Sequence, residues 1–301
     1  MSHPTSCSTA EGGCAPWDRE VLIMPRMLAV DWDRREARCV MASAAGGKLR
    51  ILMAKAVPLV DWAEGGESRP DVAGSLRALF DDPRSARAVA LVGVDRTNVE
   101  VLNLALPPAK ESELPELVGL QAFRESQATE DDAIVDFIVL GTGEEGRSDD
   151  APPTQVMAAV LTKAQLDEIQ ATCSGAGIKP ARILLRPLAA ASLFARRVSP
   201  TERVCLLVSL VGDEADLSVL ADGRVVFQRT VRLPEGVGEE AVAQRLTAEI
   251  QRTLLVAQQG PLGPNPVEKI FLFGGAEEHT QVVETVTAEL GLPASMVDPF
   301  E

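Results

Sequence analysis

Charged residues gather in two short turns, and each turn lies between two apolar strands. Residues 28–33 read Leu-Ala-Val-Asp-Trp-Asp and run into Arg34 and Arg35. Residues 207–220 read Leu-Val-Ser-Leu-Val-Gly-Asp-Glu-Ala-Asp-Leu-Ser-Val-Leu. Arginine guanidinium groups bind phosphate directly, whereas the carboxylates of the second turn have the same sign of charge as a phosphate. The two turns are therefore where this chain could bind a charged ligand.

Side chains for covalent or acid–base catalysis are scarce. The chain has two histidines, His3 in the leader and His279 at the start of a predicted helix, so a Ser-His-Asp or Cys-His arrangement is hard to build. The sequence has neither a phosphate loop with a Walker lysine nor the glycine pattern of dinucleotide-binding proteins. The five cysteines match no strong zinc spacing. No catalytic residue and no metal ligand is predicted.

Length and charge limit the remaining classes. The 301 residues suffice for two domains with their own cores, and the net charge of −15 argues against a binder of duplex DNA or anionic lipid. No apolar run approaches the roughly 18 residues that a membrane span needs. Residues 1–26 read as a disordered leader without a secretory signal. The cysteines indicate a reduced, cytoplasmic protein, with pairing or metal binding by Cys7 and Cys14 as the alternative.

Two blocks of the chain share one plan of three meandering strands, a helix, a buried strand and a second helix. The three meandering strands, the first helix and the buried strand of the first block are expected at 27–33, 37–43, 48–57, 71–81 and 88–94. Those of the second are expected at 203–211, 215–221, 224–231, 238–258, 270–273 and 277–290. The segment 96–185 between them reads as a small α+β unit. Two unrelated α/β domains are the alternative, but Gly274-Gly275 after the buried strand favours a duplicated fold, because glycine lets the backbone approach a ligand closely.

The order of these features resembles PilM, the actin-like assembly protein of type IV pili. It is also similar to the cytoplasmic domain of the type II secretion protein GspL and, more remotely, to the cell-division protein FtsA. The resemblance rests on short segments whose order is more telling than any one of them. They are Val99–Pro108, Glu113–Val118, Asp131–Val139, Val225–Val231, Glu249–Leu254, Phe271–Gly275 and Met296–Phe300.

The resemblance implies an α/β fold of duplicated actin-like (RNase H-like) domains with a small inserted subdomain. The first actin-like subdomain would comprise residues 27–95 with 186–202, and the inserted subdomain residues 96–185. The second domain would comprise residues 203–301. The related proteins continue past the segment that Met296–Phe300 resembles, so we expect this domain to be truncated.

The resemblance also assigns the two turns to the loops that hold nucleotide phosphates in actin-like ATPases. Asp31 keeps the acidic residue of the first loop, but Asp33 stands where the family has glycine, and Arg34 stands where it has a hydroxyl residue. In the second loop Ser209 replaces the metal-facing aspartate and Val211 the glycine, and Gly212 follows as a further candidate. These changes would weaken binding of ATP and Mg²⁺, since a carboxylate about 4 Å from a phosphate repels it by roughly 4 kcal/mol.

The remaining nucleotide-binding candidates are Glu249, Arg252, Gly274 and Gly275. Glu249 and Arg252 stand one helical turn apart, and a surface ion pair is the alternative interpretation. Because both phosphate loops depart from the family pattern, we expect a non-enzymatic scaffold (a pseudo-ATPase) without a cofactor. The alternative is a protein of the PilM type that binds ATP, with Arg34 or Arg35 holding phosphate.

By the same resemblance, the expected partners are the cytoplasmic tail of an inner-membrane pilus or secretion protein and a secretion ATPase. No nucleic acid partner is expected. The protein would then lie in the cytoplasm, at the inner membrane through its partners. A sugar-kinase-like phosphotransferase is a weaker third reading, since no catalytic aspartate is evident between the two domains.

Overall fold

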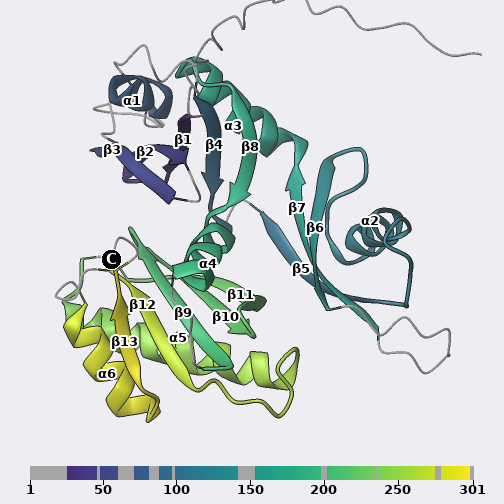
Figure 1. Cartoon of the computed structure of the whole chain (residues 1–301), viewed down its shortest axis with the longest axis vertical. Coiled ribbons are helices and arrows are strands. Elements are labelled where there is room, and N and C mark those ends of the chain that lie inside the picture. The colour runs from purple at the N-terminus through teal and green to yellow at the C-terminus, as the bar shows by residue number, and fades with distance from the viewer. Residues whose placement is uncertain are drawn as a thin grey trace, which may run out of the picture.

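The described residues form three β-sheets in three bodies, arranged around helix α4 (Arg186–Arg197) (Figure 1). The computed structural model describes residues 26–45, 48–59, 71–80, 88–96, 99–141, 153–197, 202–234, 236–274 and 279–298. None of the helices in these ranges is both long and apolar enough to cross a membrane. The expected leader (1–26) lies outside the described residues except for Arg26, and so do Gly275 and Phe300.

The first sheet has five strands in the order β3-β2-β1-β4-β8. The first three form the predicted antiparallel meander, and β4 and β8 continue the sheet in parallel to β1. Two helices cover one face, with Leu28 and Val30 of β1 packed against Leu76 and Cys173. The elements are β1 (Arg26–Trp32), β2 (Glu36–Ala45), β3 (Lys48–Pro58), α1 (Val72–Leu79), β4 (Val89–Val94), α3 (Lys163–Gly175) and β8 (Pro180–Leu185).

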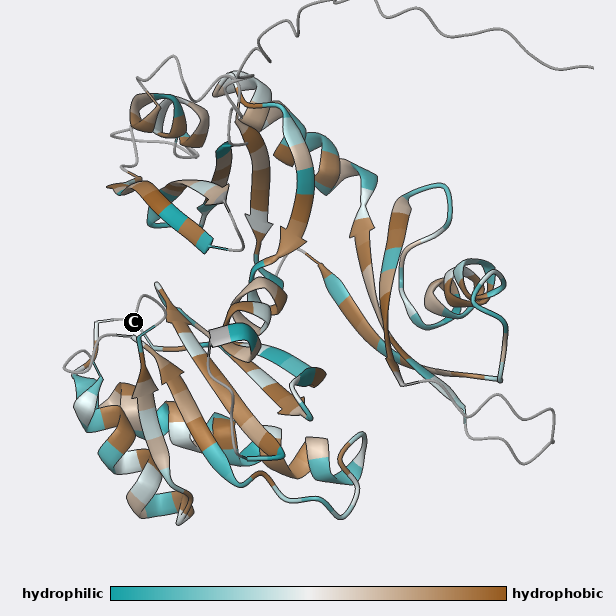
Figure 2. Ribbon diagram, in the orientation of Figure 1, coloured by the Kyte–Doolittle hydropathy of each residue, from teal (hydrophilic) through white to brown (hydrophobic). Residues whose placement is uncertain are grey.

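The second sheet repeats this plan in the order β11-β10-β9-β12-β13. The repeat confirms the duplication, because strands and helices succeed one another along the chain in the same sequence in both bodies. Figure 2 shows the apolar residues of both sheets in brown. The elements are β9 (Val204–Val211), β10 (Glu214–Ala221), β11 (Arg224–Arg232), α5 (Glu239–Gln259), β12 (Lys269–Phe273), α6 (Thr280–Leu290) and β13 (Ala294–Val297). The sequence analysis missed β13, whose four residues are too few for a clear alternation.

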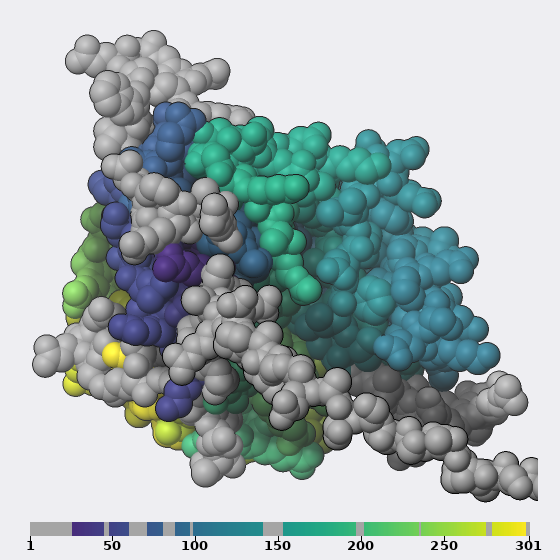
Figure 3. Space-filling model, turned by 45° about the horizontal axis from the view of Figure 1, so that its top comes forward, coloured from purple at the N-terminus to yellow at the C-terminus, as the bar shows by residue number. Residues whose placement is uncertain are grey.

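The third sheet is inserted between β4 and α3 and projects to one side of the molecule (Figure 3). Its antiparallel strands have the order β5-β7-β6, and α2 covers one face. Leu114, Val118 and Ala122 of α2 are buried against the apolar side chains of the strands. The elements are β5 (Glu100–Leu106), α2 (Leu114–Glu125), β6 (Ala133–Gly141) and β7 (Thr154–Thr162).

The boundaries of the inserted unit differ from those expected from sequence. We expected residues 96–185 to form it, but β8 pairs with β4 of the first sheet, and α3 buries Ile169 and Cys173 in the first core. The inserted unit therefore comprises residues 99–162. Helix α4 (Arg186–Arg197), expected with the first subdomain, buries Phe194 against the second sheet, with its ring 4.9 Å from that of Phe271.

Candidate functional site

The first polar turn is built by its own aspartate. The Asp33 carboxylate accepts hydrogen bonds from the backbone N–H groups of Arg35 (2.7 Å) and Glu36 (3.0 Å). An aspartate that bonds the backbone two residues ahead stabilises a turn. Burial by itself raises the pKa of Asp33, but these two N–H groups and Arg38 together hold that pKa below its ordinary value. Arg34 is exposed and has no described contact with the carboxylates.

Arg38 pairs with three carboxylates of the first hairpin. It lies opposite Asp31 in the pairing of β1 with β2, so both side chains emerge on the same face of the sheet. Its guanidinium donates to Asp31 Oδ1, Asp33 Oδ2 and Glu36 Oε1, each at 2.7 Å. Burial acts to lower the pKa of Arg38, and the three carboxylates more than reverse this effect. Asp31, which we predicted to face a nucleotide, is thus paired within its own hairpin.

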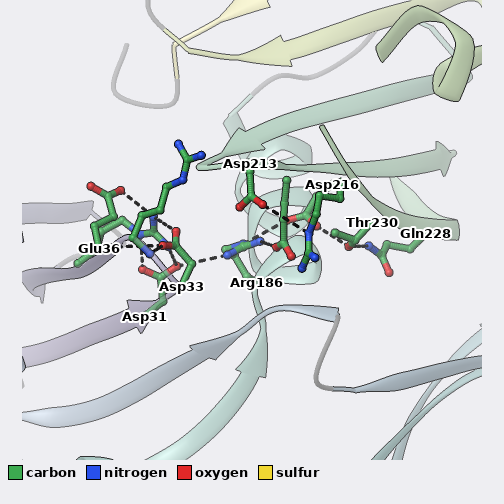
Figure 4. A network of polar contacts seen from close by, with 12 residues as sticks. Asp31, Asp33, Glu36, Arg186, Asp213, Asp216, Gln228 and Thr230 are labelled. Atoms are coloured by element: carbon green, nitrogen blue, oxygen red, sulfur yellow. Dashed lines mark hydrogen bonds and ion pairs between the residues drawn. The ribbon is translucent and has the colours of Figure 1, made fainter. Parts of the chain in front are cut away.

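Arg186 connects the first hairpin to the second. It is the first residue of α4, where the chain passes from the first sheet to the second. Its guanidinium donates to Glu214 (3.0 Å) and Asp216 (3.2 Å) of β10, and its Nη1 lies 3.9 Å from Asp31 Oδ2 (Figure 4). A single cation therefore contacts carboxylates of both sheets at the point where the hairpins face each other.

Asp216 is the most enclosed member of this network. Its side chain is 2% exposed, and the Thr230 hydroxyl donates to Oδ1 at 2.6 Å. Burial is the largest influence on its pKa and raises it, with a further contribution from Asp95, whereas Arg186 and Thr230 act in the opposite direction. The pKa of Glu214 is raised for the same main reason. Without Arg186, keeping Glu214 and Asp216 ionised in this buried position would therefore cost free energy.

The two turns lie close to each other. Gly212, in the β9–β10 turn, has φ 60°, which favours glycine, and a Cβ added to it would lie 3.1 Å from Asp33 Oδ2. A side chain at position 212 would therefore displace Asp33. At this approach of the two turns, Asp33 is paired with Arg38, and Glu214 and Asp216 are paired with Arg186.

The other predicted site residues do not join this network. Ser209 lies near the end of β9, opposite Asp216 of β10 and Phe273 of β12. Gly274 follows β12, and its N–H donates to the carbonyl of Val297 (3.2 Å), which extends the pairing with β13. Gly275 lies outside the described residues.

Glu249 and Arg252 form a separate cluster. Glu249 is 2% exposed and pairs with three arginines of β11 and α5, at 2.8 Å (Arg229), 2.7 Å (Arg245) and 3.6 Å (Arg252). The ion pair of Glu249 with Arg252, which was the alternative to a nucleotide site, is present, but Glu249 is buried whereas Arg245 and Arg252 are exposed. Arg229 and Arg245 were not anticipated, because their meeting depends on how α5 packs on the sheet.

Arg38 and Arg186 were not among the predicted site residues. Arg38 could have been found by extending the first hairpin, since residues 31 and 38 are equally distant from the turn. Arg186 gives no local signal, because its carboxylates come from other elements. Among the described residues, no group of histidine, cysteine, aspartate and glutamate side chains is suited to a metal ion.

A second candidate site is an apolar groove between the inserted sheet, β8 and α4. Its cavity has a volume of about 740 Å³. Five of its lining side chains are large, aliphatic and exposed, and exposed apolar side chains that gather in one place mark an interaction site. They are Leu49, Ile134, Ile138, Leu184 and Leu193. Asp136 and Arg196 are its charged lining residues.

Comparison with known proteins gives similarity in structure only. No family model matches the sequence, and no curated protein matches it significantly. A solved structure titled as the PilM–PilN type IV pilus biogenesis complex aligns with a TM-score of 0.72 at 18% identity, covering 91% of this chain and 88% of that one. The chain has the actin-like fold, as the sequence analysis predicted.

Two further solved structures are similar to the chain. A Bacteroides thetaiotaomicron protein with an actin-like ATPase fold and unknown function aligns with a TM-score of 0.54 at 10% identity, covering 92% of both chains. The cytoplasmic domain of EpsL, an inner-membrane component of the Vibrio cholerae type II secretion system, aligns with a TM-score of 0.51 at 14% identity. That alignment covers 88% of this chain and 94% of the EpsL domain.

Proposed function

We propose that this protein is a non-enzymatic assembly component of a type IV pilus or a type II secretion-like machine, acting in the cytoplasm at the inner membrane. The observation that carries the proposal is the closed contact between its two hairpins. In actin-like ATPases the corresponding turns hold the nucleotide phosphates, whereas here Asp33 lies against Gly212 and Arg186 pairs with Asp31, Glu214 and Asp216. The likeness to a PilM–PilN complex and to the EpsL cytoplasmic domain supports the assembly role.

In the related fold, a bound nucleotide joins two lobes of the protein through its phosphates. Here Arg186 joins the corresponding lobes, which are the bodies built on the first and second sheets, by pairing with carboxylates of both. Because Glu214 and Asp216 are largely buried, separating them from Arg186 would leave unpaired buried charges, so we expect the connection to persist at neutral pH without a hydrolysis cycle. A fixed arrangement of lobes suits a scaffold whose partners bind elsewhere.

The apolar groove is the proposed docking site for the tail of an inner-membrane partner. Exposed aliphatic side chains that converge on a cavity mark a binding site for an apolar segment. Leu184 of β8 and Leu193 of α4 come from elements that also hold the lobes together, so the groove and the ion-pair network share one support. A secretion ATPase is the proposed second partner.

The nucleotide part of the proposal is tested by calorimetry of the purified chain with Mg-ATP and Mg-ADP at millimolar concentration. We expect no heat of binding while circular dichroism shows a folded protein. Binding that Asp31→Ala removes would overturn the scaffold assignment.

The groove is tested by the substitution Leu193→Asp, with Leu120→Asp as the matched control. Leu120 is also an exposed leucine on a helix, but it lies on α2 and outside the groove lining. We expect Leu193→Asp to abolish co-purification with the inner-membrane pilus or secretion protein of the same cells, and Leu120→Asp to leave it intact. Equal recovery of the partner with both variants would refute docking in this groove.

A nucleotide-binding alternative is favoured by one observation. Arg34 lines a polar cavity of about 500 Å³ together with Trp32, Asp33 and Asp71. The Arg34 guanidinium could bind a phosphate in this cavity, away from the close approach of the two turns. Under this alternative Arg34→Ala weakens Mg-ATP binding, whereas under the scaffold proposal there is no binding to weaken.

A further inference from the structure

The outermost strand of the first sheet, β3, has the properties of a docking edge. It is 11 residues long, about twice the usual length of a strand, and it pairs with β2 alone in the described part of the sheet. An edge strand presents a row of unpaired N–H and C=O groups that a second chain can bind. Charged residues, especially lysine, and proline on an edge strand discourage pairing with a second copy of the same strand, and β3 carries Lys48, Lys55 and Pro58.

Its side chains remain exposed on both faces of the sheet. Leu49 is 60% exposed, Ile51 40% and Leu52 43%. Since successive side chains of a strand point to opposite faces, these residues offer apolar contacts above and below the edge. Leu49 also lines the groove, which places one end of β3 at the rim of that cavity.

The charge of β3 is opposite to that of the protein. The strand carries Lys48, Arg50 and Lys55 and no acidic residue, in a chain with a net charge of −15. All three side chains are exposed. Strand partners with opposite charges stabilise a pair of strands, and like charges destabilise it. This composition favours an acidic partner strand over β3 of a second copy.

The backbone groups at the free edge can be identified from one hydrogen bond. The N–H of Leu59 donates to the carbonyl of Arg35 at 2.6 Å, which marks a hydrogen-bonded pair. Antiparallel strands alternate between hydrogen-bonded and non-hydrogen-bonded pairs. In the register of β2 with β3, Ala54 and Ala56 then belong to non-hydrogen-bonded pairs, so their N–H groups point toward the free edge. Pro58 falls in the same set, where a proline costs no hydrogen bond.

We propose that β3 binds an extended segment of a protein partner in which acidic and apolar residues alternate, and that this segment adds a sixth strand to the five-stranded sheet. Backbone hydrogen bonds at Ala54 and Ala56 supply the pairing, and Lys48 and Arg50 select acidic side chains. Pairing at this edge does not depend on what fills the groove.

The test uses the full chain and two synthetic 11-residue peptides, one alternating valine with glutamate and the other valine with lysine. Fluorescence anisotropy should show binding of the glutamate peptide and at least tenfold weaker binding of the lysine peptide. Hydrogen exchange should slow at the Ala54 and Ala56 amides when the glutamate peptide is bound. Equal binding of the two peptides, or no binding at millimolar glutamate peptide, would overturn the proposal.

Two kinds of variant separate the edge from the rest of the surface. Ala54→Pro removes an outward N–H and should reduce binding at least tenfold, whereas the control Ala54→Thr keeps this N–H and should bind as the wild type does. The double change of Lys48 and Arg50 to glutamate leaves the backbone intact and should reverse the preference between the peptides.

Thermal melting confirms that each variant is folded. A folded Ala54→Pro variant that binds like the wild type would refute pairing at this edge. Self-association of the wild type that Ala54→Pro abolishes would assign the edge to a second copy instead and overturn the choice of partner.

Discussion

Replacing Arg186 by leucine should destabilise the protein more than any other single change in the ion-pair network. The side chain of Arg186 is 12% exposed, and it pairs with Glu214 and Asp216, which are 7% and 2% exposed. Removing one partner of a buried ion pair leaves an unpaired charge and costs about 3–5 kcal/mol. Two carboxylates lose their partner here, so we expect a loss at the upper end of this range. Domains typically have a total stability of about 5–15 kcal/mol.

The matched control is Arg203→Leu. Arg203 pairs with Asp222 at 3.1 Å, but the two side chains are 73% and 66% exposed, and such pairs contribute about 0–1 kcal/mol. Urea unfolding followed by circular dichroism measures both variants at pH 7. The same pair of titrations at pH 5 should show a smaller loss for Arg186→Leu, because protonation of Glu214 and Asp216 removes the unpaired charge.

Equal losses of stability for Arg186→Leu and Arg203→Leu at pH 7 would refute this prediction. A loss for Arg186→Leu that does not depend on pH would also refute it. The first result would mean that the carboxylates at the hairpins reach water without Arg186. The second would mean that packing, and not charge, accounts for its contribution.

Two further predictions concern the same site. Gly212→Ala should lower the free energy of unfolding by roughly 1–3 kcal/mol, because φ is 60° at this residue and the new Cβ would meet Asp33. The control Gly119→Ala, in α2 with open space around it, should raise the free energy of unfolding by about 0.5–1 kcal/mol. Urea or thermal unfolding measures both, and a tolerated Gly212→Ala would contradict the close approach of the two turns. Asp216→Asn should gain stability relative to the wild type as pH rises from 3.8, the ordinary pKa of this carboxyl, toward its raised folded pKa. The reason is that the folded wild type binds this proton more tightly than the unfolded chain, so the wild type loses up to about 1.4 kcal/mol per pH unit in this window. Urea titrations between pH 4 and pH 7 measure the free energies of unfolding of Asp216→Asn and the wild type. If the difference between them does not change with pH, the pKa of Asp216 is not raised.

Much of the fold could be predicted from local pattern. The turn Asp222-Gly223 joins β10 to β11 with positive φ at both residues, as its sequence indicated. The stripe of Leu246 and Ile250 on α5 is buried, because a period of 3.6 residues places such side chains on one face. The two three-strand meanders and the helix that follows each of them were expected on the same grounds.

Other parts of the fold depended on pairing between distant segments. α3 and β8 follow the inserted sheet in the chain, yet they complete the first sheet, because β4 offers β8 a parallel edge. β13 pairs in parallel with β12, and its four residues alone carry no signal of this.

The sequence alone determined which residues of the candidate site are charged and that Asp31 and Asp33 stand at a turn between strands. It also located Glu249 and Arg252 one turn apart on a helix. Only the tertiary structure decided how those charges are paired, because Arg186 reaches Glu214 and Asp216 across about 30 positions of chain, and Gly212 meets Asp33 between two separate sheets. Local patterns fix the period and the ends of an element, whereas the pairing of charges depends on which elements pack together, and packing is a property of the whole chain.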